Sequence, residues 1–147
     1  MSTRASDANP AGPVLKVVEV AAGLVFRRGD LLITQRYPDA HLGGLWEFPG
    51  GKREPHETFT ECLHRELREE LGIEVEVREE VEFLTHDYPE KRVLLRFFRC
   101  AWRRNEPQTL GCPAFHWVRR EDLAQYEFPA ADARLLGKLA SWDELWQ

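Results

Sequence analysis

Three glutamates, Glu66, Glu69 and Glu70, have the spacing in this chain that points most directly to chemistry. At about 100° per residue, Glu66 and Glu70 fall within the arc of side chains that a helix over 59–71 would bury, and Glu69 lies at its edge. Like charges four residues apart on a helix repel each other, and this repulsion destabilises the helix more where water is scarce. The cluster therefore predicts a divalent cation, and oxygen-only ligands favour Mg²⁺ or Mn²⁺.

A phosphate substrate is expected with such a cation. Mg²⁺ keeps several waters and commonly bridges one or two carboxylates to substrate phosphates. The alternative is a solvated, salt-bridged helix face on which Arg65 and Glu69 form an i,i+4 pair. Periodicity alone leaves both interpretations open.

The element that must position these glutamates is a helix over 59–71. Thr58 is a candidate N-cap, Gly72 can supply a left-handed C-terminal residue, and no residue between them breaks a helix. One apolar stripe would pack on the core, formed by Phe59, Cys62, Leu63, Leu67 and Leu71.

The segment before this helix, 37–51, is predicted to be a long loop because it is rich in glycine and proline. Gly50 and Gly51 permit close backbone approach, which leaves a carbonyl or amide free to face a metal or a phosphate. Arg36 and Lys52 flank the loop. Each either holds phosphate oxygens or is a solvated charge.

The rest of the chain predicts a sheet with a closing helix. A hairpin or two neighbouring strands come first, with a turn at Gly29-Asp30, and the C-terminal helix should bury Trp142 and Trp146. The expected strands are 14–26, 31–36, 73–77, 81–84, 93–102 and 114–118, with a turn at 86–91, a helical turn at 121–126 and the closing helix at 133–146.

Composition favours one soluble domain. The chain has 147 residues, 43% of them hydrophobic, and a formal net charge of −5. We expect a flexible leader over 1–13, without the apolar region of a signal peptide, and a single domain over 14–147. The acidic balance argues against a nucleic-acid polymer as partner, and no run is long enough for a transmembrane helix. Three cysteines without metal-like spacing are read as reduced, which favours the cytoplasm.

At this point the motifs resemble a known family. The order and spacing of the residues Gly51, Glu57, Arg65, Glu66, Leu67, Glu69, Glu70, Gly72 and Ile73 match the Nudix box. The resemblance extends to the MutT branch of the Nudix hydrolases through GLWEFPGGK at 44–52, HDYPEKR at 86–92, Trp117 and FPAAD at 128–132. It implies an α/β fold, an α/β/α sandwich with a mixed β-sheet and a loop-helix-loop at the site. It also implies hydrolysis of a nucleoside triphosphate, typically 8-oxo-dGTP, to monophosphate and pyrophosphate.

The resemblance also assigns catalytic roles. Glu66, Glu69 and Glu70 would be ligands of Mg²⁺, and the Gly50 carbonyl a further one. Arg65 would orient a glutamate, and Glu57 would brace the loop that begins at Gly51. A metal-activated water would attack a phosphorus in line with the leaving phosphate, and Glu66 is chosen as the acceptor of its proton.

Recognition of the base would involve residues outside the box. By resemblance, Phe48 would offer backbone groups to the base, Tyr88 would lie against its face, and Lys91 would approach it. Asp132 falls where MutT carries asparagine, and an ionised carboxylate accepts hydrogen bonds but cannot donate them. Asp132 also opens a helical segment, so the alternative is a simple N-cap.

One departure concerns the segment before Trp117, where many MutT relatives place a metal-binding glutamate. Glu106 is the only acid available there. Either it reaches the site through a rearranged loop, or the site works with fewer carboxylates.

Two alternative functions and the oligomeric state stay open. The first alternative activity is a CTP or modified-pyrimidine triphosphate pyrophosphohydrolase, with ADP-ribose and dinucleotide polyphosphates behind it. The second alternative is a noncatalytic module that binds a nucleotide. The chain could be a monomer or a homodimer, and strand 93–102 could pair across a dimer or stay internal.

Overall fold

The computed structural model describes residues 16–147, so the predicted leader over 1–13 lies outside the described residues. The strands are β2 (Lys16–Arg27), β3 (Asp30–Gln35), β4 (Trp46–Glu47), β5 (Gly50–Lys52), β6 (Glu74–Asp87), β7 (Lys91–Arg104) and β8 (Phe115–Val118). The α-helices are α1 (Phe59–Leu71) and α2 (Ala133–Ser141), and the 3₁₀ helices are η1 (Arg120–Gln125), η2 (Ala130–Asp132) and η3 (Asp143–Trp146).

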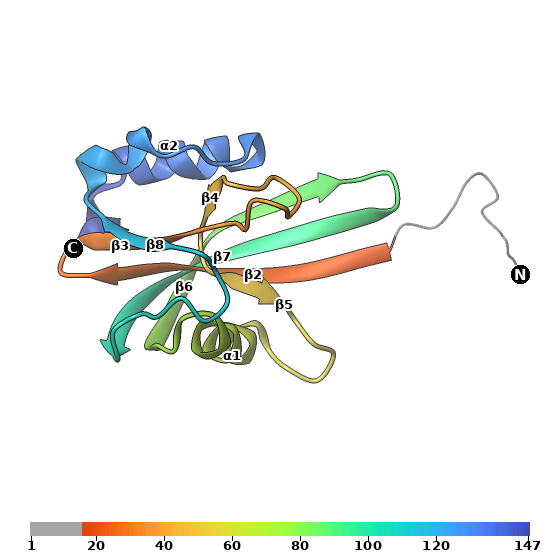
Figure 1. The fold of residues 1–147 in the computed structure, drawn as a ribbon, viewed down its shortest axis with the longest axis horizontal. Coiled ribbons are helices and arrows are strands. Elements are labelled where there is room, and N and C mark those ends of the chain that lie inside the picture. Colours follow the sequence, from red (N-terminus) through yellow and green to blue (C-terminus); the bar gives the residue numbers. More distant parts are fainter. Residues whose placement is uncertain (1–15) are drawn as a thin grey trace, which may run out of the picture.

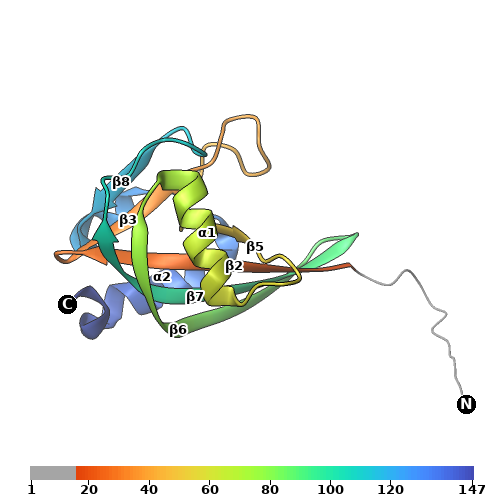
Figure 2. The ribbon, with the colours of Figure 1, turned by 90° about the horizontal axis from the view of Figure 1, so that it is seen from below.

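The strands join in one mixed sheet between two helices. Along its main path the order is β4-β3-β2-β7-β6, while β5 pairs with β2 and β8 with β3. Strands β2 and β7 are parallel, and the other pairs are antiparallel. Helix α2 covers one face and α1 the other (Figure 1), and α1 lies across the sheet when seen from below (Figure 2). The predicted α/β/α sandwich is confirmed.

Strand β2 contributes to both cores because its side chains alternate between the two faces. Ala21 and Val25 pack in the cluster that contains α1, whereas Ala22, Leu24 and Phe26 pack in the cluster that contains α2. Burial on both faces explains the nearly continuous apolar run at 20–26. The central strand thus fixes how the two helices are placed relative to each other.

The predicted hairpin forms, with its turn displaced by one residue. Arg27 pairs with Asp30, so Arg28 and Gly29 are the two turn residues. Their φ angles are 51° and 84°. Positive φ at both central residues gives the twist that suits a two-residue hairpin.

Helix α1 has the predicted ends. The Thr58 hydroxyl accepts a hydrogen bond from Glu61 N, and the Glu61 carboxylate accepts one from Thr58 N, which forms a capping box. Gly72 closes the helix with φ 72°. The predicted apolar stripe faces the core, because Cys62, Leu63, Leu67 and Leu71 are buried, with Phe59 partly buried beside them.

The prediction of an unbroken loop over 37–51 is wrong at its C-terminal end. Trp46 and Glu47 pair with β3 as strand β4. Gly50 and Gly51 pair with Ala22 and Ala21 of β2 as part of strand β5. These strands depend on partners far away in the sequence, which local glycine and proline content does not reveal.

Two other predicted boundaries need correction. The strands expected at 73–77 and 81–84 are one strand, β6, because β7 continues the ladder through register shifts near Glu80. The closing helix ends at Ser141 instead of reaching residue 146. The backbone leaves the helical conformation at Trp142, and η3 follows. The Trp146 ring in η3 packs against the Phe26 ring, with the ring centroids 5.2 Å apart. Trp146 is buried as predicted, but Trp142 is 38% exposed.

Strand β7 is internal, because β2 and β6 hydrogen-bond to its two sides. Pairing of 93–102 across a dimer is therefore excluded. All three cysteines are buried free thiols, as predicted. Within 16–147, no helix has the length and apolar character needed to cross a membrane.

Candidate active site

Strand β5 brings two glycines against the glutamates of α1. The Gly50 amide donates a hydrogen bond to Glu70 Oε1 at 3.3 Å. A Cβ atom on Gly51 would overlap the carboxylate of Glu66, and one on Gly50 would overlap the Ala21 carbonyl of β2. Glycine is needed at both positions so that the backbone can pass between β2 and the two carboxylates.

The Arg65 guanidinium links the loop to the glutamates. It donates to the Glu57 carboxylate through Nε at 3.0 Å and Nη2 at 2.6 Å, and to the Lys52 carbonyl at 3.0 Å. Its Nη1 lies 2.9 Å from Glu66 Oε2 and 3.3 Å from Glu69 Oε1. The bonds from Arg65, together with one from the Glu54 amide, lower the pKa of Glu57 to about 2. Arg65 therefore holds Glu66 in one orientation while Glu57 holds Arg65.

Of the three glutamates, only Glu69 fits the alternative of a solvated, salt-bridged helix face. Its side chain is 62% exposed and makes the expected i,i+4 pair with Arg65. Burial raises the pKa of Glu66, against the opposing effect of Arg65. Burial also raises the pKa of Glu70 to about 8, and the nearby Glu47 carboxylate adds to the shift. Partial burial of Glu66 and Glu70 thus disfavours the charged form of both carboxylates.

These donors suit a hard divalent cation. The carboxylates of Glu66, Glu69 and Glu70 and the carbonyl of Gly50 offer only oxygen, the ligand that Mg²⁺ and Mn²⁺ prefer. Over residues 16–147, however, no three His, Cys, Asp or Glu side chains are grouped closely enough to hold a metal. Mg²⁺ often takes only one or two carboxylates and completes its shell with water and phosphate oxygens. The residues present therefore fit such an ion without forming a closed cage.

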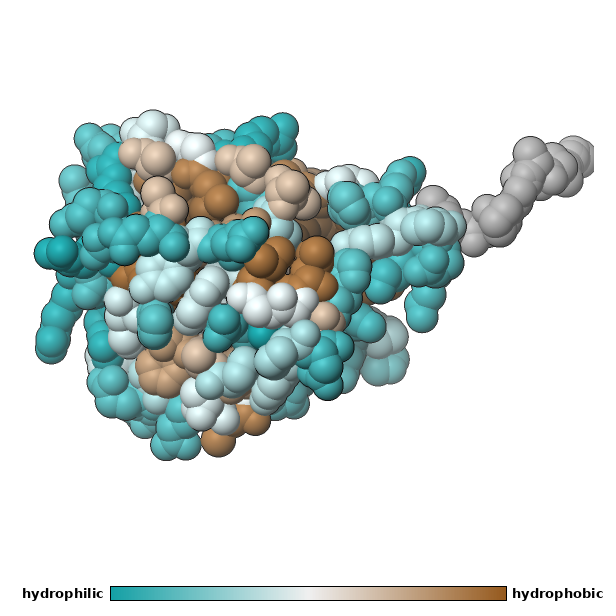
Figure 3. All heavy atoms as spheres, turned by 45° about the horizontal axis from the view of Figure 1, so that its top comes forward, coloured by the Kyte–Doolittle hydropathy of each residue, from teal (hydrophilic) through white to brown (hydrophobic). Residues whose placement is uncertain are grey.

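A cavity of about 900 Å³ opens beside β5. Its wall includes the glycines of β5 and all six residues predicted to bind substrate, Arg36, Phe48, Lys52, Tyr88, Lys91 and Asp132. Figure 3 shows apolar side chains exposed in the middle of the face that carries α2, among hydrophilic ones. Gly50 and Gly51 line this cavity and also contact the carboxylates of Glu70 and Glu66, respectively.

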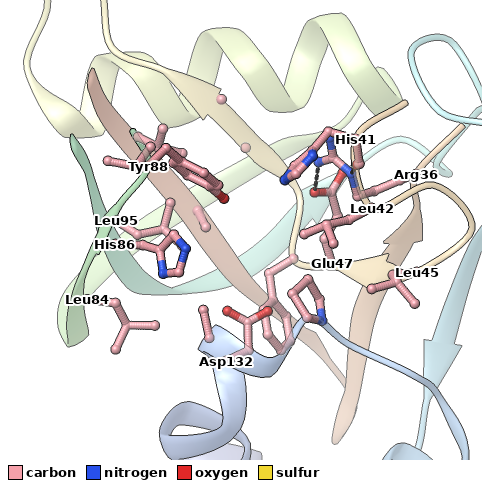
Figure 4. A pocket seen from close by; sticks show the side chains of 18 of the residues that line it. Arg36, His41, Leu42, Leu45, Glu47, Leu84, His86, Tyr88, Leu95 and Asp132 are labelled. Carbon is pink, nitrogen blue, oxygen red and sulfur yellow. Dashed lines mark hydrogen bonds and ion pairs between the residues drawn. The ribbon is translucent and has the colours of Figure 1, made fainter. Parts of the chain in front are cut away.

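The cavity wall combines apolar strand residues with aromatic rings. Phe48 is buried, and its ring stacks on Phe128 with centroids 5.0 Å apart. The Tyr88 ring meets His86 at 4.6 Å and His41 at 5.6 Å, so side chains from two distant loops approach across the opening. Figure 4 shows His86 and Tyr88 on one side of the cavity and His41 on the other.

Asp132 lies on the cavity wall and is 6% exposed. Asp132 is the N-cap residue of α2 by position, as the alternative interpretation expects, but its side chain makes no capping hydrogen bond to the helix. Burial raises the pKa of its carboxyl from the usual 3.8 to about 6, and the Glu47 carboxylate contributes to the shift. The side chain points into the cavity (Figure 4), where a ligand could provide its hydrogen bonds.

The Arg36 guanidinium is hydrogen-bonded to other residues of the protein. It donates to Glu47 Oε1 at 2.8 Å and to the His41 carbonyl at 2.6 Å. Its predicted contact with phosphate stays a prediction, as does that of Lys52, whose side chain is exposed at the cavity edge. Glu47 is a cavity residue that sequence reasoning missed. Its position between an aromatic residue and the FPGG sequence was the available signal.

Glu106 does not reach the site. Its carboxylate pairs with Arg27 at 2.7 Å and is 73% exposed. Gly111 occupies the neighbouring position instead, where an added Cβ would lie 3.2 Å from the Cα of Glu70. The segment before Trp117 therefore packs on the end of α1 without adding a carboxylate.

Comparison with known proteins gives a consistent result. A family model described as a NUDIX domain matches residues 21–138. An 8-oxo-dGTP diphosphatase of Proteus vulgaris is 40% identical over 92 residues, which are 62% of this chain and 82% of the relative. A CTP pyrophosphohydrolase of Escherichia coli strain K12 is 37% identical over 122 residues, 83% of this chain and 90% of the relative.

The fold comparison points the same way. The solution structure of the E. coli ORF135 protein superimposes with a TM-score of 0.72 at 36% sequence identity. The match covers 86% of this chain and 91% of that chain.

Proposed function

The chain belongs to the NUDIX domain family and is a hydrolase of phosphoric anhydrides, and on that premise we propose that it cleaves nucleoside triphosphates to monophosphate and pyrophosphate, with 8-oxo-dGTP as the preferred substrate. One observation carries the proposal. Two partly buried glutamates, Glu66 and Glu70, lie behind a glycine strand that forms the wall of a nucleotide-sized cavity. Such an enzyme would remove oxidised nucleotides from the precursor pool.

Glu66, Glu69, Glu70 and the Gly50 carbonyl would hold a divalent cation, with Mg²⁺ favoured and Mn²⁺ acceptable. Such an ion, when bound, neutralises phosphate charge and makes a water molecule more acidic. Binding requires the ionised carboxylates, so the proton that burial favours on Glu70 must leave first.

The hydrolysis itself needs little covalent chemistry from the protein. A water oxygen bonds to one phosphorus of the α–β anhydride, the bridging P–O bond breaks, and its electron pair leaves with the departing phosphate. Glu66 takes the proton of the water, and Arg65 keeps the Glu66 carboxylate in place at 2.9 Å. Positioning and charge neutralisation supply most of the rate.

The base would occupy the apolar end of the cavity. Phe48 would present backbone groups to it, and Tyr88 and Lys91 would lie along its other edge. Asp132 would accept hydrogen bonds from base N–H groups when ionised, and could also donate one when protonated. Its pKa of about 6 leaves it mostly ionised at neutral pH.

The second candidate is a CTP or modified-pyrimidine triphosphate pyrophosphohydrolase. The CTP pyrophosphohydrolase of E. coli is 37% identical over 83% of this chain, whereas the 8-oxo-dGTP diphosphatase of the same strain is 31% identical over 85% of it. An acceptor such as Asp132 suits the amino group of cytosine as well as the N–H groups of oxidised guanine. The relative kcat/KM for the two triphosphates separates these candidates.

The remaining parts of the proposal concern context. The enzyme would act in the cytoplasm on free nucleotides, as a monomer or homodimer, without a nucleic-acid polymer or a membrane as partner. The net charge of −5 supports the absence of a polymer, because nonspecific binding to a polyanion needs a basic surface.

The test is product formation with Mg²⁺ across 8-oxo-dGTP, dGTP, CTP, 5-methyl-dCTP, ADP-ribose and diadenosine polyphosphate. A higher kcat/KM for 8-oxo-dGTP than for dGTP and CTP is expected, with monophosphate and pyrophosphate as products. A pyrimidine preference would favour the second candidate. If no nucleotide is cleaved but one raises Tm, the chain is a binding module and the proposal fails.

A further inference from the structure

Glu82 on strand β6 is a buried acid with no part in the proposed chemistry. Among the described residues, the acids that the fold buries most completely are Glu82 and Asp132, at 7% and 6% exposed. The Glu82 carboxylate accepts hydrogen bonds from Arg134 Nε at 2.9 Å and Nη2 at 3.2 Å. It also accepts bonds from Lys138 Nζ at 3.3 Å and from the Phe83 amide at 3.2 Å. These bonds compensate for the water that a buried charge has lost.

Both cations belong to helix α2 and lie one turn apart. Residues four apart lie on the same side of a helix, so Arg134 and Lys138 reach β6 together. Arg134 Nη2 also donates to the Phe83 carbonyl at 3.3 Å, and Lys138 Nζ donates to the Val81 carbonyl at 3.1 Å. Helix α2 is therefore anchored on β6 around Glu82, through side-chain and backbone oxygens alike.

No flexible joint separates this anchor from Asp132. Asp132 ends η2, and α2 begins at the next residue, Ala133, whose backbone is helical with φ −55° and ψ −42°. Arg134 follows directly. The Asp132 side chain makes no capping hydrogen bond of its own. Its place in the cavity wall therefore follows from where the start of α2 is held.

The same anchor reaches the strand that forms the neighbouring wall of the cavity. Alternate residues of a strand point to the same face, and Leu84 and His86 follow Glu82 at this spacing. Both residues line the cavity together with Asp132 (Figure 4). The ion pairs of Glu82 therefore set the separation between Asp132 and this part of β6.

The burial of the three charges makes the anchor hard to release. The side chains of Arg134 and Lys138 are 68% and 38% exposed, whereas that of Glu82 is 6% exposed. Loss of the cations would leave a buried carboxylate without partners, which is strongly unfavourable. The two-pronged contact from Arg134 also fixes direction as well as distance.

We propose that Glu82 is a positioning residue for base recognition. Its carboxylate, bound by Arg134 and Lys138, fixes the start of α2 on β6 and thereby holds Asp132 at the cavity wall. This rests on the proposed function, because there Asp132 is the residue that accepts hydrogen bonds from the base. A purely stabilising ion pair would affect Tm without moving Asp132.

The first test is a ¹³C NMR titration of the Asp132 carboxyl in the full chain, without nucleotide or metal. The pKa in the wild type should be about 6, because the carboxyl is buried. Glu82→Gln and Arg134→Gln should both lower this pKa toward 3.8, because the start of α2 loosens and water reaches Asp132.

The two variants separate position from charge. Loss of the negative charge of Glu82 would by itself lower the pKa of Asp132, whereas loss of the positive charge of Arg134 would by itself raise it. The Arg134→Gln result therefore decides: a lowered pKa supports the proposal, and an unchanged or raised pKa overturns it. Glu80→Gln is the matched control, because Glu80 lies on the same strand in a two-pronged pair with Arg96 and should leave the pKa unchanged.

Thermal unfolding checks that each variant is folded. Arg134 has an exposed side chain, so Arg134→Gln carries the test even if Glu82→Gln does not fold.

The second test is calorimetric binding of 8-oxo-dGMP and CMP in the presence of EDTA. Arg134→Gln should weaken binding of the preferred nucleotide by about tenfold, as loss of a hydrogen bond to a charged group does. In an Asp132→Ala background the same substitution should have no further effect, because no carboxylate is left to position. Equal weakening in both backgrounds would overturn the proposal.

The two proposals can fail separately. If the wild type cleaves nucleotides while Arg134→Gln leaves the pKa of Asp132 unchanged, the proposed function stands and Glu82 does not position Asp132. If the pKa falls as expected but the wild type neither cleaves nor binds a nucleotide, Glu82 positions Asp132 and the proposed function falls.

Discussion

The Cα atom of Gly51 faces the Glu66 carboxylate so closely that a methyl group at Gly51 would overlap it. Strand β5 therefore acts as a backbone wall against which the carboxylate rests, and Arg65 holds the same carboxylate from the other side at 2.9 Å. The position of Glu66 depends on having no side chain at residue 51.

Gly51→Ala should displace Glu66 and break its bond to Arg65. We expect kcat to fall by roughly a hundredfold, the effect of about 1 Å of misplacement in an active site, with modest loss of stability because the overlap is with the end of a side chain. Gly137→Ala is the control, since its methyl group would enter open space on α2. It should stabilise the protein by about 0.5–1 kcal/mol and leave kcat unchanged. Normal turnover by Gly51→Ala would contradict the assignment of Glu66.

Glu70→Gln should remove turnover and leave the fold intact. The amide is isosteric and neutral, and the folded protein already disfavours charge on Glu70, whose pKa is raised to about 8. We expect kcat to fall by on the order of a thousandfold, with an unchanged far-UV circular dichroism spectrum. Glu61→Gln on the same helix is the control, because glutamine preserves the capping box. Activity retained in Glu70→Gln would exclude Glu70 as a metal ligand.

Arg65→Lys should impair the site despite keeping the charge. Arg65 makes a two-pronged contact with Glu57 and a further bond to Glu66, and an ammonium group cannot reproduce this geometry. A fall in kcat of about 10- to 100-fold is expected. Arg68→Lys, at an exposed position that pairs with Glu74, is the control and should keep full activity. Equal kcat values for the two variants would mean that Arg65 does not position Glu66.

The ion pair between Arg65 and Glu57 predicts that the folded protein loses stability in acid. Arg65 lowers the folded-state pKa of Glu57 from 4.5 to about 2. The unfolded chain therefore binds more protons between these values, so the stability from this contact is present above pH 4.5 and is lost as the pH falls toward 2. Acid-induced unfolding of Arg65→Lys should show less of this loss than that of the wild type.

Asp132→Asn should stabilise the folded protein at neutral pH. The folded-state pKa of Asp132 is raised from 3.8 to about 6, so the folded state binds more protons than the unfolded state across this window. Stability from this residue is complete below pH 3.8, falls as the pH rises to 6, and stays lost above it. Asparagine does not titrate, so Asp132→Asn keeps this stability as the pH rises. The variant should be more stable than the wild type at pH 7 by on the order of 2 kcal/mol.

Tm measured against pH checks this expectation. The difference in Tm between Asp132→Asn and the wild type should grow from pH 4 to 6 and then level off. Asp143→Asn, which removes an exposed carboxylate paired with Arg120, should show no such growth. A flat difference for Asp132→Asn would mean that its carboxylate is not buried as the structure has it. Because asparagine can also donate, the ratio of kcat/KM for 8-oxo-dGTP and CTP should shift as well.

Elements whose ends depend on nearby residues could be predicted from the sequence. The capping box of Thr58 and Glu61 and the left-handed Gly72 fix α1, and both features involve neighbours in the chain. The hairpin between β2 and β3 has the same local origin, although its turn lies one residue earlier than predicted. Strands β4 and β5 could not be predicted, because their partners are β3 and β2.

The sequence by itself determined the chemistry of the site: oxygen donors at helical spacing on Glu66, Glu69 and Glu70, with Gly50 and Gly51 just upstream. Only the tertiary structure decided which charges meet. It paired Arg36 with Glu47, turned Glu106 away toward Arg27, and buried Asp132 in the cavity wall without a capping bond. Motif spacing is a property of one segment, whereas burial and ion pairing depend on how strands far apart in the chain are brought together.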